Sequence, residues 1–118
     1  MKKLLAAAAA IAAASMLAGN AHAYGAIAVD HASKGINPAY GFSTGASSRQ
    51  AAERIATAYC SERGRDCKPV VWFETCGAYA NSRTHYGYGY GANKADATAK
   101  ALKMCGSNQC EVVVAKCQ

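Results

Sequence analysis

Cysteine is the residue type in this sequence with the clearest chemistry. The chain holds six cysteines, at Cys60, Cys67, Cys76, Cys105, Cys110 and Cys117. An even number of cysteines in a short exported chain predicts a disulfide framework, whereas cysteine thiolates could instead bind zinc. The disulfide interpretation is favoured because export, argued below, places the chain in an oxidising compartment and because no C-x-x-C pair occurs. We therefore predict three disulfides, no metal site and no cofactor.

The remaining polar residues do not form a recognisable catalytic arrangement. Beyond residue 23 the histidines are His31 and His85, both expected in hairpin loops, and Asp30 precedes the first of them. Neighbours on a strand point to opposite faces, so Asp30 and His31 are not an orienting pair by default. The 7 carboxylates form no evident acid/base pair, and H-E-x-x-H and G-x-S-x-G are absent. We predict binding rather than catalysis, with a small hydrolase as the weaker alternative.

The aromatic residues are the candidate binding residues. In the run Tyr86 to Gly91, tyrosine and glycine alternate, so a strand would carry Tyr86, Tyr88 and Tyr90 on one face. Tyr40 and Phe42 repeat this pattern. We predict that these five side chains form a platform on the sheet face away from the helices, suited to an envelope glycan or protein. The alternatives are that they only cover the sheet, or that the chain is an inhibitor or immunity-type protein against a secreted enzyme.

Two short helices are predicted from an internal repeat. When Cys105 is aligned on Cys60, similar residues recur without a gap before each cysteine. The matched pairs are Ser48 with Asn93, Ala52 with Ala97, Ala56 with Ala101, and Tyr59 with Met104. Serine and asparagine are good N-caps, and the spacing places the matched residues on one helical face that is mostly alanine.

The predicted strands repeat as well. Their matched segments are Val70–Phe73 with Glu111–Val114, Gly25–Ala28 with Gly77–Ala80, and Tyr40–Phe42 with Tyr86–Tyr88. Most are rich in β-branched or aromatic residues, and each half reads as strand, strand, helix, strand, at about 24–76 and 77–118. The first half is longer because of a polar segment, His31 to Ala39, which is expected to be a loop. The predicted fold is α+β, with the duplicated units forming an antiparallel or mixed sheet and two short helices on one face.

The repeat also limits the packing and the disulfides. The glycines between the tyrosines leave one sheet face without side chains, which favours close packing of the alanine-rich helices. Of the 15 possible cysteine pairings, few treat both halves alike. We favour Cys60–Cys67 and Cys105–Cys110, each joining a helix end to the next strand. Cys76–Cys117 would then connect the final strands of the two halves. A symmetric alternative joins Cys60 to Cys110.

The amino-terminal segment reads as a signal peptide. Lys2 and Lys3 precede an apolar run of about 14 residues, and Ala21-His22-Ala23 forms an A-x-A cleavage signal. The run is shorter than the ~20 residues that a membrane-spanning helix needs, so no membrane anchor is expected. Cleavage after Ala23 would leave residues 24–118 as a single domain in the periplasm or the medium. Its net charge of +4, against +6 for the whole chain, comes from scattered basic residues and does not favour nucleic-acid binding.

Several segments together resemble a known family. These are Tyr24–Asp30, Ser48–Ala52, Cys67–Phe73, Cys76–Ala80 and Tyr86–Gly89. They are similar to the bacterial domain-of-unknown-function family 4189 over essentially the whole mature chain. The resemblance implies an exported bacterial protein and supplies no activity, cofactor or catalytic residue.

Overall fold

The computed structural model describes residues 23–32 and 37–118. The predicted signal peptide, up to residue 22, and residues 33–36 of the predicted polar loop lie outside the described residues. The first unit contains β1 (Tyr24–Asp30), β2 (Tyr40–Ala46), α2 (Arg49–Ser61) and β3 (Cys67–Phe73). The second contains β4 (Cys76–Asn81), β5 (Tyr86–Gly91), α3 (Lys94–Cys105) and β6 (Glu111–Cys117). The predicted α+β fold of duplicated strand-strand-helix-strand units is confirmed.

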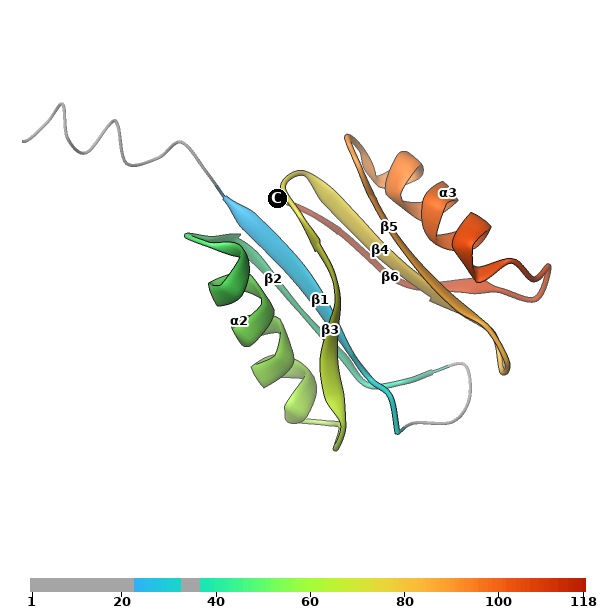
Figure 1. Ribbon diagram of the computed structural model, residues 1–118, viewed down its shortest axis with the longest axis horizontal. Coiled ribbons are helices and arrows are strands. Elements are labelled where there is room, and N and C mark those ends of the chain that lie inside the picture. The colour runs from blue at the N-terminus through green and yellow to red at the C-terminus, as the bar shows by residue number, and fades with distance from the viewer. Residues whose placement is uncertain (1–22, 33–36) are drawn as a thin grey trace, which may run out of the picture.

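Each unit forms its own antiparallel sheet, with strand order β2-β1-β3 in the first and β5-β4-β6 in the second. The sequence predicted one sheet with both helices on one face. In the structure the two sheets instead lie between the helices, which occupy the outer sides of the molecule (Figure 1). The reason is visible in β1, where Ala26 and Ala28 pack against α2 while Ile27 and Val29 pack in a separate core cluster. A strand buried on both faces needs a layer on each side.

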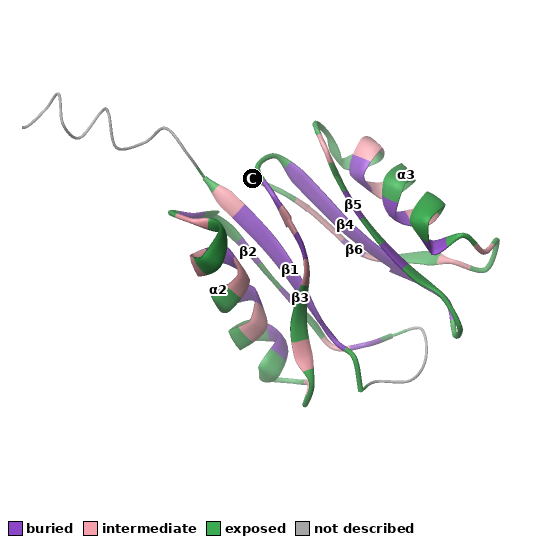
Figure 2. Cartoon of the chain, viewed as in Figure 1, coloured by how far each residue is buried: buried purple, intermediate pink, exposed green. Residues whose placement is uncertain are grey.

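Three small cores hold the four layers together. An alanine-rich cluster lies between α2 and the first sheet, and a matching cluster lies between α3 and the second sheet. The larger apolar side chains meet between the two sheets, where Ile27, Val29, Val71 and Phe73 pack with Tyr79 and Val114. The central strands β1 and β4 are accordingly buried along most of their length (Figure 2).

The helices begin and pack as their sequences predict. The Ser48 hydroxyl accepts a hydrogen bond from the Ala51 amide at 3.0 Å, and the Asn93 side-chain oxygen accepts one from the Asp96 amide at 2.8 Å. These are N-caps, which satisfy amides that the first helical turn leaves unpaired. The predicted faces, Ala52, Ala56 and Cys60 in α2 and Ala97, Ala101 and Cys105 in α3, are buried.

The three predicted disulfides, Cys60–Cys67, Cys76–Cys117 and Cys105–Cys110, are present, and no cysteine in the described part of the chain is free. The expected location of Cys76–Cys117 was wrong, however. Cys76 is the first residue of β4 and lies opposite Cys117 of β6, so this bond closes the second sheet from within. It does not connect the final strands of the two halves, because β3 ends before Cys76.

Candidate functional site

The five predicted binding residues lie on the two edge strands β2 and β5. Phe42 pairs with Ile27, and Tyr88 pairs with Tyr79, so each aromatic series shares a face with residues of the core between the sheets. All five point away from the helix of their own unit, as the alternation predicts. They remain between 36% and 63% exposed because they lie at the rims of the sheets.

The structure does not bring the two aromatic series together into one platform. Phe42 of β2 lies beneath Lys116 of β6, with the ammonium 4.4 Å from the ring centroid, whereas β5 contacts β3. Since β1 and β4 are the middle strands, Tyr40 and Phe42 lie at one rim of the molecule and the β5 tyrosines at the opposite rim. Any binding surface must therefore be built separately at each rim.

At the β5 rim, part of the aromatic series covers the core. Tyr86 stacks on Tyr79 with ring centroids 6.2 Å apart and an interplanar angle of 24°. Tyr79 is buried, and the pKa of its hydroxyl is raised above the usual value of a tyrosine. The larger cause is burial, which disfavours the charged form, and the smaller cause is the nearby Tyr86. Tyr86 is thus held by stacking on another ring, whereas the Phe42 ring contacts the Lys116 ammonium.

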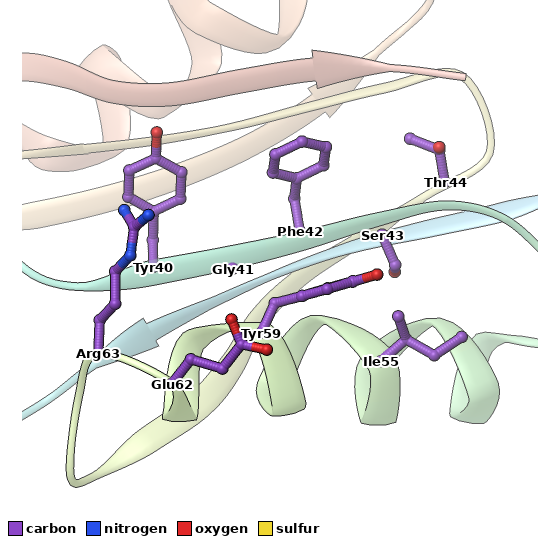
Figure 3. A pocket seen from close by; sticks show the side chains of 9 residues that line it. All are labelled: Tyr40, Gly41, Phe42, Ser43, Thr44, Ile55, Tyr59, Glu62 and Arg63. Atoms are coloured by element: carbon purple, nitrogen blue, oxygen red, sulfur yellow. The ribbon is translucent and has the colours of Figure 1, made fainter.

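At the β2 rim, the strand edge and α2 enclose a groove of about 490 Å³, which we call the β2 groove. Its lining residues are Tyr40, Gly41, Phe42, Ser43, Thr44, Ile55, Tyr59, Glu62 and Arg63. Figure 3 shows the rings of Tyr40 and Phe42 on one side of β2 and the side chains of Ile55 and Tyr59, from α2, on the other. Sequence reasoning identified Tyr40 and Phe42 but missed Ile55 and Tyr59, which are 40% and 55% exposed.

The floor of the β2 groove is an unpaired strand edge. The Asp30 amide donates to the Ala39 carbonyl at 2.9 Å, and hydrogen-bonded and non-bonded pairs alternate along an antiparallel ladder. Ala28–Gly41 is therefore a bonded pair, and the pairs of Tyr40 and Phe42 with β1 are not. The backbone N–H and C=O groups of Tyr40 and Phe42 consequently point out of the sheet, into the groove.

The equivalent edge of β5 is covered by side chains of α3. The Tyr88 amide donates to the Met104 sulfur at 3.4 Å, and the Lys100 ammonium donates to the Tyr90 carbonyl at 3.2 Å. In the repeat, Met104 corresponds to Tyr59 and Lys100 to Ile55. No hydrogen bond joins either of these two α2 residues to β2 in the described part of the chain. This difference could have been found in the repeat alignment, because Lys100 is aligned with Ile55, whose side chain cannot donate a hydrogen bond.

A second hollow, of about 590 Å³, lies between the β3–β4 turn and the start of α3. Two of its charged side chains, Asp96 and Lys100, form an ion pair at 3.3 Å, and Lys100 also lies 5.7 Å from the Tyr90 ring centroid. These groups already satisfy one another, so this hollow offers less to a ligand than the β2 groove does.

The two histidines border a third hollow, of about 320 Å³, where the hairpin loops of both units meet. Asp30 is not positioned to orient His31, because its carboxylate accepts hydrogen bonds from the backbone amides of Ala32, Arg65 and Asp66. It therefore fixes the loop before β3. His85 contacts the neighbouring Thr84 hydroxyl at 2.8 Å. Among the described residues no group of three or more His, Cys, Asp and Glu side chains could hold a metal ion.

Comparison with known proteins places the whole folded region in one family. The family model described as "Domain of unknown function (DUF4189)" matches residues 24–117. The chain belongs to the DUF4189 family. A search of curated proteins found no match to this DUF4189 protein.

A solved structure similar to this DUF4189 domain is the NMR structure of Rv1813c from Mycobacterium tuberculosis, at 24% sequence identity. The match covers 81% of this chain and 75% of that chain, with a TM-score of 0.59. At this identity the similarity concerns the fold alone. It shows that the arrangement of strands, helices and sheets also occurs in that protein.

The disulfides bear on the cellular compartment in which the protein is found. Three disulfides in so small a domain are compatible with an extracytoplasmic protein, because such bonds persist in oxidising compartments. No helix among the residues that the structure describes is long and apolar enough to cross a membrane.

Proposed function

We propose that this DUF4189 protein is an exported binding module of the bacterial envelope that holds a partner protein in the β2 groove and acts without catalysis. The observation that carries the proposal is the contrast between the two equivalent strand edges. The β5 edge is covered by Lys100 and Met104, whereas the β2 edge opens into a groove walled by aromatic side chains. Exposed aromatic anchors beside unpaired backbone groups are typical of protein-binding surfaces.

A protein partner fits the β2 groove better than a glycan does. Sugars stack on open aromatic faces, but the Lys116 ammonium occupies one face of the Phe42 ring at 4.4 Å. The Ser43 hydroxyl already donates to the Ala52 carbonyl at 2.6 Å, so its proton is not available to a sugar hydroxyl. The groups left over are the side chains of Tyr40, Ile55 and Tyr59, a few polar or charged side chains, and backbone N–H and C=O groups. Another polypeptide can complement this mixture. An inhibitor of one secreted enzyme would be a particular case of such a module.

Export gives a direct prediction about processing. The proposed cleavage point after Ala23 lies immediately before Tyr24, the first residue of β1, so cleavage would leave the strand and its pairing with Ala46 intact. We expect intact-mass measurement of the secreted protein to give the mass of residues 24–118 with three disulfides. A mass that includes residues 1–23, or an added lipid, would contradict the proposed processing.

The groove itself is tested by paired substitutions at the two rims. Phe42→Ala and Tyr59→Ala should each weaken binding of the partner by about tenfold or more, since buried aromatic anchors contribute most of an interface's energy. The matched controls are Tyr88→Ala and Met104→Ala at the equivalent positions, which should bind as the wild type does. The oxidised domain would be used to capture partners from the native envelope, followed by affinity measurement with each identified protein.

Two results would contradict this assignment. If the Phe42 and Tyr88 variants lost binding equally, the β2 groove would not be the site. If purified cell-wall glycan, rather than a protein, were retained and its retention required Phe42, the partner class would be wrong. Thermal unfolding of all four variants is the control for folding.

A further inference from the structure

We infer that the partner enters the β2 groove as an extended, net acidic segment that adds to the first sheet as a further strand beside β2. This inference rests on the proposed function and specifies how the partner is recognised. Affinity in such a complex comes from main-chain hydrogen bonds, and specificity comes from the side chains that line the edge.

The first argument is the geometry of the unpaired groups. Tyr40 and Phe42 each present one backbone donor and one backbone acceptor outward, about 7 Å apart, as expected for alternate residues of a strand. An extended polypeptide carries donors and acceptors at the same repeat. A folded surface or a compact ligand does not present that spacing, so the complementary occupant is a strand.

The second argument is that the opposite rim shows what protection of such an edge looks like. Exposed strand edges are templates for pairing with other chains, and proteins usually blunt them, often with lysine. In the second unit, Lys100 and Met104 contact the outward carbonyl of Tyr90 and amide of Tyr88. At the same positions the first unit has Ile55 and Tyr59, which line the groove and leave the edge accessible.

The third argument concerns charge. Arg63 lines the β2 groove, and Lys116 lies over Phe42 at its rim, against one carboxylate, Glu62. Two cations to one anion favour a segment that carries acidic side chains. The net charge of +4 on residues 24–118 adds a long-range attraction for an acidic segment.

The experiment uses a displayed library of random linear peptides, selected on the oxidised domain and then measured as synthetic peptides. The closed-edge variant, Ile55→Lys with Tyr59→Met, copies the residues of the second unit into the first. It should bind the selected peptides at least about tenfold more weakly than the wild type. The matched control, Lys100→Ile with Met104→Tyr, should retain their binding at the β2 groove. Both altered pairs are on the helix surface, so thermal unfolding should show folded proteins.

Loss of apolar contact could also weaken binding to the closed-edge variant, so N-methylation of the peptide provides the decisive measurement. In strand addition, only alternate peptide amides donate to β2. A single N-methyl group should therefore abolish binding when it is placed on one of these amides, and should be tolerated on the amides between them. The selected sequences should be acidic on average, and their binding should weaken with salt.

Each outcome separates the two proposals. Peptides that need Phe42 but show no two-residue periodicity would overturn strand addition and leave the groove as the binding site. Selected peptides that ignore every β2-groove substitution, together with envelope partners that do the same, would overturn the proposed function. Dimerisation of the free domain that is lost in the closed-edge variant would show that the edge pairs with a second copy, and would overturn the partner segment.

Discussion

Removing the Cys76–Cys117 disulfide by changing both cysteines to alanine is expected to destabilise the domain by about 4 kcal/mol, which is a large fraction of the roughly 5 to 15 kcal/mol that stabilises a domain. The bond joins residues 41 positions apart, whereas Cys60–Cys67 and Cys105–Cys110 close loops of 7 and 5 positions. On the chain-entropy account, the longer loop gives the larger constraint on the unfolded chain, and each short loop gives about 2 kcal/mol.

The location of the bond adds a second reason for a large effect. Cys76 and Cys117 pair across β4 and β6, and Cys76 is buried, so the bond also fixes the register of the second sheet. Urea unfolding of the three double-alanine variants, each compared with the wild type, measures the effect. Equal losses in all three variants would contradict the loop-length argument, and the Cys105–Cys110 variant is the matched control because it belongs to the same unit.

The features that follow from local sequence were predicted correctly. Ser48 and Asn93 begin the helices, and the alanine spacing gives the buried helix faces, because caps and helical periodicity depend on residues a few positions apart. The disulfide pairs followed from the symmetry of the repeat.

The packing of one sheet on the other was not predicted, because it depends on contacts between units. The run Ala26 to Val29 is apolar at every position, which is typical of a strand covered on both faces. The run by itself does not show that the second face is covered by the other sheet, through Tyr79 and Val114. The large side chains Ile27 and Val29 mark the face that meets the other sheet, and the small alanines mark the face that meets α2.

For the candidate site, two of the aromatic residues that line the groove were predicted from the sequence, but the groove itself was not. Alternation predicted that Tyr40 and Phe42 point away from α2, yet it also predicted one shared platform with the β5 tyrosines. The separation of the two rims follows from sheet order, which alternation does not encode. The duplication gave two similar edges, and substitutions at two helix positions made one edge closed and the other accessible.

The close approach of helices to sheets leads to the remaining large effect, for Gly41→Ala and Gly87→Ala. A Cβ atom at Gly41 would collide with the Ala56 carbonyl oxygen and the Cys60 amide nitrogen, and one at Gly87 with the same backbone atoms of Ala101 and Cys105. These are helix backbone atoms, so no rotamer change relieves the overlap, and the helix itself must move.

We expect each glycine substitution to destabilise the domain by about 2 to 3 kcal/mol, because overpacking against rigid neighbours exceeds the roughly 0.5 to 1 kcal/mol that alanine gains over glycine in a strand. Thr44→Ala, at an exposed position of β2, is the control and should change stability by less than about 0.5 kcal/mol. The free energies of unfolding would be compared by urea titration of the oxidised proteins.

Moving α2 also moves Tyr59, so Gly41→Ala should weaken peptide binding at the β2 groove, whereas Gly87→Ala should lose stability and keep its affinity. An alanine at position 41 that leaves both quantities unchanged would show that α2 can shift freely on its sheet, and that the groove is not held by this contact.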